Sequence, residues 1–208
     1  MKYVCCIGNF DGVHLGHKVL IDRVVEAAGD NFIPAVITFS FGEGHKCLTT
    51  DETKNQILYS MGIQEIITIP FDKEFSLIPK NIFINYFLNR MDIETLICGK
   101  DFTFGNNAEG TSEYLKNYDN KNFNVEVLDE LNVENRKVSS TWIKELISEG
   151  NIKKANELLG HNYTITCQDN ILPPAGAYII ASEEGTKRYK FNPENKIKKA
   201  LELIDVAE

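Results

Sequence analysis

Short apolar stretches alternate with amphipathic stretches of helical period through most of this chain. The apolar stretches, each predicted to be a buried strand, are residues 3–7, 33–39, 65–69, 95–98 and 124–128. The stretches predicted to be helices between and after them are residues 19–28, 49–61, 81–91, 111–118, 139–149 and 151–159. This alternation favours a parallel sheet covered by helices on both faces. In such sheets, ligands bind beyond the carboxyl ends of the strands.

The C-terminal part of the chain has a different pattern. Residues 163–167, 177–182 and 187–191 read as three short strands of a small meander, with Glu184-Gly185 as its best turn. The tail after Asn192-Pro193 reads as a helix, with Ile197, Leu201 and Ile204 on one face. The expected fold class is therefore α/β: a Rossmann-like parallel five-stranded sheet in residues 1–162, and a small C-terminal β/α annex in residues 163–208.

Composition and charge exclude several classes of protein. The 208 residues carry a net charge of −8, whereas a general nucleic-acid binder needs a basic face for the phosphates. No apolar run has the length of a membrane span, and the N-terminus leads directly into a predicted strand. We therefore expect a cytoplasmic protein without nucleic-acid or membrane partners. The five cysteines are expected to be small buried hydrophobic residues and not metal ligands or disulfides. The sequence does not predict an oligomeric state.

One stretch between the first predicted strand and the first predicted helix carries the chemistry. It runs from Gly8 to His17, and glycines frame a tight turn where a Cβ atom would be costly. His14 and His17 are three residues apart at the start of the helix, so one helical turn brings them to the same face. Imidazoles and the free N–H groups of a helix N-terminus together make an anion site, and phosphate is the expected anion.

His14-Leu15-Gly16-His17 resembles the HxGH signature of the nucleotidylyltransferases, and the whole string resembles the opening of the adenylyltransferase module of bacterial FAD synthetases. That family includes bifunctional riboflavin kinase/FAD synthetases. The resemblance implies that His14 and His17 are catalytic. It also implies an ATP site that includes Gly8, Asn9, Phe10, Asp11, Gly12, His14, Gly16 and His17. The alternative is a capped turn without chemistry.

A second motif, from Gly99 to Gly110, follows the fourth predicted strand and resembles the flavin loop of the same family. The resemblance implies flavin binding by Asp101, Phe102, Phe104 and Gly105. The two phenylalanines are two residues apart, so in an extended loop they point the same way and would line a slot for the isoalloxazine ring. The alternatives are that the phenylalanines belong to the core and that Asp101 is an ordinary turn residue. Many family members have an arginine where Ala108 stands.

A third motif, from Val138 to Lys144, resembles the family's ISSTxIR signature. Ser139 or Ser140 is expected to cap the helix that follows. The resemblance implies ATP binding by Ser139, Ser140, Thr141 and Lys144, and a catalytic role for Lys144. The family's arginine is a lysine here, which keeps the charge but loses the bidentate fork. The alternatives are a plain capped helix and a solvated lysine.

Two departures from the family pattern concern the acceptor and the second module. Residues 38–43 replace the T-F-D-P-H-P that members usually carry after the second strand, and His45 is the nearest histidine. The chain continues past the family's closing L-L-G-x-x-Y pattern at residues 158–163. Residues 172–178 resemble a short piece of the riboflavin kinase module, whose P-T-A-N signature is absent from the chain.

Together these resemblances imply an FAD synthetase that transfers AMP from ATP to FMN and releases pyrophosphate, without riboflavin kinase activity. Mg²⁺ is expected to enter with ATP and to keep several waters, so no protein residues are predicted to bind metal. Two alternatives stay open: a nucleotidylyltransferase with a different phosphorylated acceptor, and a non-catalytic flavin or nucleotide sensor.

Overall fold

The computed structural model describes residues 1–42 and 44–207. The chain divides into two compact units. The first unit consists of Met1–Phe10, His17–Gly42 and Asn55–Leu131, and the second of Asp11–Gly16, Glu43–Lys54 and Asn132–Glu208. Residues 163–208 lie wholly in the second unit, together with shorter segments from the N-terminal part. The boundary expected after residue 162 stays a prediction.

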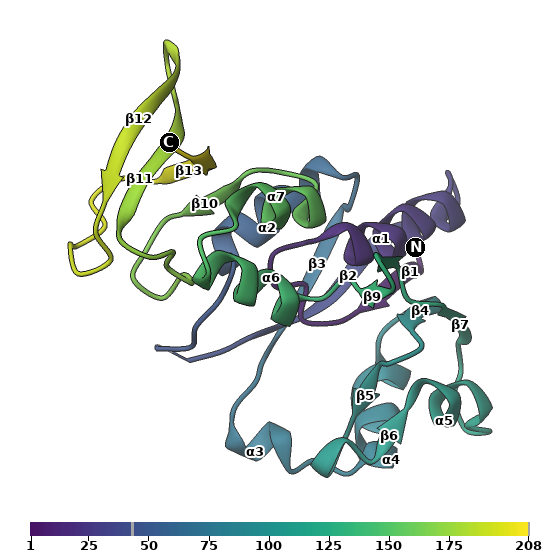
Figure 1. Cartoon of the computed structure of the whole chain (residues 1–208). Coiled ribbons are helices and arrows are strands. Elements are labelled where there is room, and N and C mark those ends of the chain that lie inside the picture. The colour runs from purple at the N-terminus through teal and green to yellow at the C-terminus, as the bar shows by residue number, and fades with distance from the viewer. Residues whose placement is uncertain (43, 208) are drawn as a thin grey trace. The chain divides into compact units, whose positions relative to one another are not determined.

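A parallel sheet of five strands forms the centre of the first unit (Figure 1). The strands are β1 (Tyr3–Ile7), β2 (Ile33–Ser40), β3 (Glu65–Pro70), β4 (Ile93–Gly99) and β7 (Asn124–Leu128). They lie in the order β3-β2-β1-β4-β7, and every neighbouring pair is parallel. All five predicted strands and the α/β fold class are therefore confirmed.

Both faces of this sheet are covered. Successive strand residues point to opposite faces, and Val4, Cys5, Cys6 and Ile7 of β1 are all buried. One face carries a core that includes Cys5 and Ile7 of β1, together with Ile84 and Leu88. Cys5, Cys6 and Cys98 are buried free thiols, and burial raises the pKa of Cys98 to about 12. These three cysteines behave as the small apolar residues expected, while Cys47 and Cys167 are half-buried.

The helices include those predicted, but the first begins at Leu15 instead of Val19, and the short helix over Lys73–Ser76 was not predicted. They are α1 (Leu15–Ala28), α2 (Asp51–Ser60), α3 (Lys73–Ser76), α4 (Lys80–Ile82) and α5 (Ser112–Asn117). Two further turns of helix follow α4, a π-helix over Phe83–Phe87 and a 3₁₀-helix over Leu88–Arg90. The predicted helix over residues 81–91 is thus a mixed helical segment. In α1 the buried residues Ile21, Val24 and Ala28 recur at the spacing of one helix face.

The second unit holds two helices and an antiparallel sheet. The helices are α6 (Ser140–Ser148) and α7 (Ile152–Leu159). The strands are β10 (Tyr163–Ile165), β11 (Gly176–Ser182), β12 (Gly185–Phe191) and β13 (Leu201–Val206), in the order β10-β13-β11-β12. The hairpin between β11 and β12 closes with Ser182 paired to Gly185, so its turn is Glu183-Glu184, one residue before the predicted turn. Short paired strands elsewhere are β5 (Thr103–Phe104) with β6 (Gly110–Thr111), and β8 (Asn132–Val133) with β9 (Arg136–Lys137).

The tail contains the largest error of the secondary-structure prediction. The helix expected after Asn192-Pro193 is absent from the described residues, and Leu201–Val206 forms strand β13 instead. This strand pairs with β10 on one side and β11 on the other, so the predicted three-strand meander is also wrong. The apolar spacing of Ile197, Leu201 and Ile204 suits one face of a helix. The sequence does not reveal that the sheet has room for a strand between β10 and β11, where Leu203 is fully buried.

Candidate functional site

The turn between β1 and α1 is fixed at its start by backbone contacts within the first unit. The Gly8 amide donates to the Ile37 carbonyl at 3.1 Å, and the buried Thr38 hydroxyl donates to the Asn9 carbonyl at 3.1 Å. Phe10 is fully buried although its φ is +53°, a left-handed conformation that is uncommon for a residue with a Cβ. Such strain persists only where the surroundings hold it, and it often marks a functional turn.

Gly12 has a conformation and a position that exclude a side chain. Its φ is +81°, and an added Cβ would lie 2.6 Å from the Leu48 Cδ1 atom. Its amide donates to the buried Thr49 hydroxyl at 3.1 Å. Its carbonyl oxygen lies 3.0 Å from Nε2 of His161. The glycine therefore lets the turn come close to residues 48–49 and leaves both of its own polar groups satisfied.

Gly16, between the two histidines of the motif, is the second glycine at which there is no room for a side chain. His14 is almost fully buried, and α1 begins at the next residue. A Cβ on Gly16 would lie 3.2 Å from the His14 ring and 3.3 Å from the Val138 carbonyl oxygen, tighter than ordinary contact. His17 is half-buried, and its ring centroid lies 5.0 Å from that of Phe10. The glycine at the third position of HxGH thus lets the His14 ring lie against the helix start.

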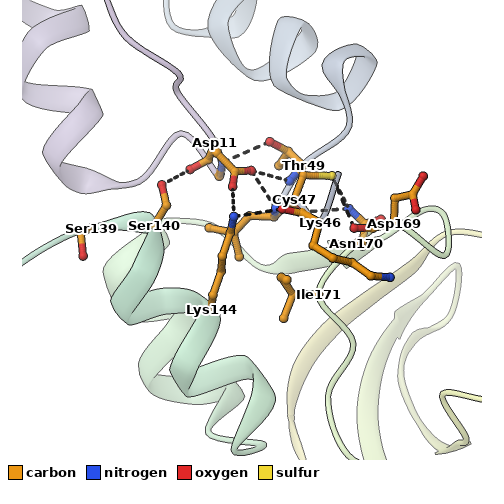
Figure 2. Close-up of polar contacts among 12 residues, drawn as sticks. Asp11, Lys46, Cys47, Thr49, Ser139, Ser140, Lys144, Asp169, Asn170 and Ile171 are labelled. Atoms are coloured by element: carbon orange, nitrogen blue, oxygen red, sulfur yellow. Dashed lines mark hydrogen bonds and ion pairs between the residues drawn. The ribbon is translucent and has the colours of Figure 1, made fainter. Parts of the chain in front are cut away.

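Asp11 is the centre of a polar cluster in the second unit (Figure 2). It is 5% exposed, and its Oδ1 accepts hydrogen bonds from the Leu48 amide at 2.7 Å and the Thr49 amide at 3.2 Å. Its Oδ2 pairs with Nζ of Lys144 at 2.7 Å. Its carbonyl oxygen accepts a hydrogen bond from Oγ of Ser140 at 2.8 Å. The structure therefore brings together three of the residues predicted to bind ATP: Asp11, Ser140 and Lys144.

Lys144 has a more constrained environment than the sequence indicates. Its ammonium pairs with Asp11 and also donates to the Lys46 carbonyl at 3.1 Å, and 28% of its side chain is exposed. The alternative of a solvated lysine is therefore wrong. The ammonium of Lys144, in the first half of α6, is held by the nearly buried carboxylate of Asp11, and part of the Lys144 side chain is still open to solvent.

The N-terminus of α6 has the cap that the sequence predicts. Ser139 is the N-cap residue, and its hydroxyl accepts a hydrogen bond from the Trp142 amide at 3.3 Å. The hydroxyl of Ser140 is used by Asp11, as described above, while Thr141 is exposed in the first turn. Each hydroxyl of the Ser-Ser-Thr run therefore has a different environment, and that of Thr141 is the most open to solvent.

A cavity in the first unit has the character of an aromatic binding slot. It has a volume of about 430 Å³ and is lined by five phenylalanines, namely Phe39, Phe71, Phe75, Phe83 and Phe104, and by the backbone of residues 105–108. Gly105 has a φ of +79°, and an added Cβ would lie 2.8 Å from the Lys80 amide nitrogen. Two of the predicted flavin residues, Phe104 and Gly105, thus belong to the cavity wall.

The other two predicted flavin residues lie outside that lining. The Phe102 ring stacks on Phe104, with centroids 5.5 Å apart and an angle of 19° between planes, and it packs against the core cluster of the first unit. Asp101 is exposed. The two phenylalanines do point the same way, as expected, but Phe104 separates Phe102 from the cavity wall. The core alternative therefore describes Phe102, whereas Phe104 belongs to both the core and the cavity.

Several residues of these sites were missed from the sequence. Phe71 and Phe75 belong to the cavity but lie in a stretch without a motif. Thr49 was not predicted as a site residue, yet its hydroxyl accepts from the Gly12 amide, and the Thr50 hydroxyl caps α2 through the Thr53 amide. His161 had a detectable signal, because it follows the closing leucines of α7 within the family's L-L-G-x-x-Y pattern. In the divergent 38–46 stretch, His45 is exposed and Glu43 lies outside the described residues.

No metal-binding cluster emerges from the part of the chain that the structure describes. Within residues 1–42 and 44–207 no group of three or more His, Cys, Asp or Glu side chains is placed to hold an ion. The two anionic oxygens of Asp11 are already taken by two amides and an ammonium. No helix in the same ranges is long and apolar enough to cross a membrane.

Comparison with known proteins agrees with this architecture. The profile of the FAD synthetase family matches residues 1–142. The bifunctional riboflavin kinase/FMN adenylyltransferase of Listeria monocytogenes is 30% identical over 171 residues, which cover 77% of this chain and 54% of that protein. The protein of the same name from Buchnera aphidicola (Acyrthosiphon pisum) is 33% identical over 175 residues, which cover 78% and 56%. This chain thus spans about half the length of these bifunctional relatives.

Two further matches extend over more of the chain. A protein named FAD synthetase, also from Listeria monocytogenes, is 27% identical over 198 residues, covering 84% of this chain and 79% of its own length. The crystal structure of a protein named macrolide-efflux protein from Streptococcus pneumoniae aligns with 99% of this chain and 86% of its own. Its TM-score is 0.80 at 20% identity, a likeness that shows the fold alone.

The five-stranded parallel sheet, with the HxGH turn between β1 and α1, defines an α/β protein with its motif at the carboxyl end of a central strand. The chain belongs to the FAD synthetase family.

Proposed function

We propose that this chain is an FMN adenylyltransferase: it transfers AMP from ATP to FMN and releases pyrophosphate. The observation that carries the proposal is the built HxGH turn, with its strained backbone and its two required glycines, in a chain of the FAD synthetase family. The relatives named FMN adenylyltransferase and FAD synthetase support the same activity. Residues 1–162 would form the transferase domain and residues 163–208 an annex, in a cytoplasmic protein.

The chemistry needs alignment more than it needs a base. The FMN phosphate is an anion at neutral pH, so it attacks the α-phosphorus of ATP in line and pyrophosphate leaves. The residues of this chain must orient the phosphates and stabilise the charge that grows on the α-phosphoryl oxygens and the leaving group. His14 and His17 would donate hydrogen bonds to those oxygens. Gly8, Asn9, Phe10, Gly12 and Gly16 would bring the backbone of the turn close to the nucleotide.

The start of α6 would bind the outer phosphates. The N-terminal end of a helix carries free N–H groups and a partial positive charge, both suited to an anion. Ser139, Ser140 and Thr141 supply hydroxyls there, and Thr141 is the most exposed of them. Lys144 would act as a point charge, with Asp11 holding its ammonium in place. We assign a catalytic role to Lys144 because its ammonium would still contact the phosphates in the transition state.

Mg²⁺ enters this account as part of the ATP substrate. The oxygens of the Asp11 carboxylate have partners of their own, namely two backbone amides and the Lys144 ammonium. An ion bound to the phosphates that keeps several waters fits this arrangement, since Mg²⁺ loses its hydration shell reluctantly. The ion would neutralise phosphate charge, and the side chains above would do the orienting.

The phenylalanine-lined cavity is the proposed flavin site. A flat aromatic ring system gains from offset or edge contacts with phenylalanine rings beyond the area that it buries. Phe104 and Gly105 would contact the ring, while Asp101 and Phe102 would support the loop from outside the lining. Phe71 is 39% exposed and lines the cavity, so it can be shortened with little effect on the core.

Phe71→Ala is expected to raise KM for FMN roughly three- to tenfold, the worth of one aromatic contact, with KM for ATP unchanged. Steady-state kinetics with each substrate varied in turn measure both constants. Tyr86→Ala is the matched control, because Tyr86 is an exposed aromatic residue of the same unit that does not line the cavity. An unchanged KM for FMN in Phe71→Ala would exclude this cavity as the flavin site.

A second candidate rests on the divergent stretch after β2. Residues 38–43 lack the histidine that family members usually carry there, which would suit a nucleotidyltransferase with a different phosphorylated acceptor. A non-catalytic sensor of flavin or nucleotide would bind ligand without releasing pyrophosphate. The intact histidine pair favours the catalytic readings over the sensor.

The test is to incubate the pure chain with ATP, Mg²⁺ and FMN and to separate the flavins by chromatography. FAD and pyrophosphate should form in equal amounts. Riboflavin in place of FMN should stay unchanged, because the chain lacks the kinase signature. Adenylylation of another phosphorylated acceptor with FMN untouched would favour the second candidate, and FMN formed from riboflavin would contradict the kinase prediction.

A further inference from the structure

The turn between β10 and β11 contacts residues 46–48, next to the Leu48 and Thr49 amides that bind the Asp11 carboxylate (Figure 2). Residues 46–48 run beside residues 168–171, with a parallel bridge between Cys47 and Asn170. The Cys47 amide donates to the Asp169 carbonyl at 3.0 Å, and the Ile171 amide donates to the Cys47 carbonyl at 2.9 Å. The Lys46 ammonium donates to the Gln168 carbonyl at 2.6 Å. The annex is therefore attached to this segment mainly through backbone groups.

Asn170 is the side chain whose amide bonds to the annex turn and to residues 47–48 at the same time. It is fully buried. Its Oδ1 accepts hydrogen bonds from the Thr166 amide at 2.7 Å, the Thr166 hydroxyl at 3.0 Å and the Cys167 amide at 3.0 Å. Its Nδ2 donates to the Leu48 carbonyl at 3.2 Å. One end of the amide therefore organises the annex turn, and the other end holds residue 48.

Residue 48 is held on its other side by Asp11. The Leu48 amide donates to the carboxylate whose second oxygen pairs with Lys144, while the Leu48 carbonyl accepts from Asn170. The Leu48 side chain is fully buried and packs against Gly12. A continuous series of hydrogen bonds thus runs from the annex turn through the backbone of Leu48 and Asp11 to the Lys144 ammonium. Each link is short and mostly buried, so a displacement at one end is transmitted to the other.

We propose that Asn170 is a positioning residue through which the annex controls the ATP affinity of the transferase site, by holding residues 46–49 where they fix Asp11 and Lys144. The inference rests on the proposed function for its kinetic consequence and on the geometry alone for its structural one. The annex thereby has a role in this chain without any kinase chemistry: it completes the support of the phosphate-binding lysine.

The decisive variant is Asn170→Asp. The new Oδ1 keeps accepting from Thr166 and Cys167, so the annex turn retains its organisation. The second oxygen replaces the Nδ2 donor and repels the Leu48 carbonyl, so the bonds from Nδ2 to the Leu48 carbonyl and to the Cys47 sulfur are lost. We expect the dissociation constant of ATP, measured by calorimetry without FMN, to rise roughly tenfold, as for one lost buried hydrogen bond. The KM for FMN should change less than twofold.

Thr166→Val is the matched control. It removes one hydroxyl that donates to Asn170 Oδ1 but leaves the Nδ2 bond to Leu48. ATP affinity should stay at the wild-type value even if the melting temperature falls. Equal losses of ATP affinity in Thr166→Val and Asn170→Asp would mean that Asn170 merely stabilises the annex, and would overturn the positioning role.

A measurement on the unaltered chain keeps the proposal falsifiable if Asn170→Asp does not fold. Because coupling between sites is reciprocal, ATP binding should slow hydrogen exchange at the Cys47 and Ile171 amides and leave the amides of the β11–β12 hairpin unchanged. Unaltered exchange at Cys47 and Ile171 with ATP bound would contradict the coupling. ATP binding with this protection but no FAD formation would reject the proposed function alone. A chain that does not bind ATP would contradict both.

Discussion

His17→Ala is expected to lower kcat for FAD formation by roughly 10²–10³-fold, the cost of losing one hydrogen-bond donor to the transition state. The reason is that the charge to be stabilised grows on the α-phosphoryl oxygens only as the reaction proceeds, so the donor matters more for kcat than for substrate binding. His17 is half-buried beside Phe10, so its truncation leaves the sheet core untouched. Single-turnover kinetics at saturating ATP and FMN measure the effect without product release.

His14 needs a gentler substitution because it is almost fully buried. His14→Asn retains polar atoms in the space beside Gly16, and a loss of kcat similar to that of His17→Ala is expected. Lys18→Ala is the control, since Lys18 is an exposed neighbour on the same helix that pairs only with Asp22 among the contacts described. Turnover near wild type in both histidine variants would remove the phosphate role from this turn.

Lys144→Ala should have two separable effects. It should raise KM for ATP with little change in FMN kinetics, because a point-charge contact to an outer phosphate exists before and during the reaction. It should also lower the free energy of unfolding by about 3 kcal/mol, the low end for breaking a buried ion pair, because Asp11 is left without its cation. Denaturant titration measures the second effect independently of activity.

The two effects separate in a double variant. Asp11→Asn removes the stranded charge, so Lys144→Ala combined with Asp11→Asn should recover most of the lost stability while KM for ATP stays high. Lys144→Arg would restore a bidentate fork and lower KM for ATP if the longer side chain still fits beside Asp11. Lys153→Ala, at an exposed position of α7, is the control for loss of a lysine. If KM for ATP is unchanged in Lys144→Ala, Lys144 serves only to pair Asp11.

Local patterns predicted the parts of this molecule that depend on local physics. The strands of the parallel sheet are short apolar runs whose two faces are both buried, so each strand can be recognised without its neighbours. The Ser139 cap and the left-handed Gly12 and Gly160 likewise follow from residue type, since few residues tolerate those positions. The HxGH turn was recognised from its motif, although the atoms that exclude a side chain at Gly12 and Gly16 include Leu48, Leu159 and Val138 from distant parts of the chain.

The parts that sequence missed depend on partners far apart in the chain. Strand β13 is specified by the open edges of β10 and β11, which no local pattern reveals. The ion pair of Asp11 and Lys144 joins residues far apart in the chain, so the sequence implied ATP binding by both but did not indicate that they pair. The phenylalanine-lined cavity takes Phe71 from the segment after β3 and Phe75 from the short helix α3, and neither residue lies in a recognisable motif. Asn170 is buried although asparagine is usually exposed, because its amide satisfies donors and acceptors from two segments.

The most direct test of the central claim uses ATP labelled with ³²P at the α-phosphorus. The pure chain, Mg²⁺ and this ATP are incubated with FMN and, in parallel, with a phosphorylated acceptor that has no flavin ring. We predict that the label appears in FAD, that unlabelled pyrophosphate accumulates in equal amount, and that the second acceptor stays unlabelled. Label transferred to the second acceptor with FMN untouched, or FMN bound without any transfer of label, would contradict the assignment as an FMN adenylyltransferase.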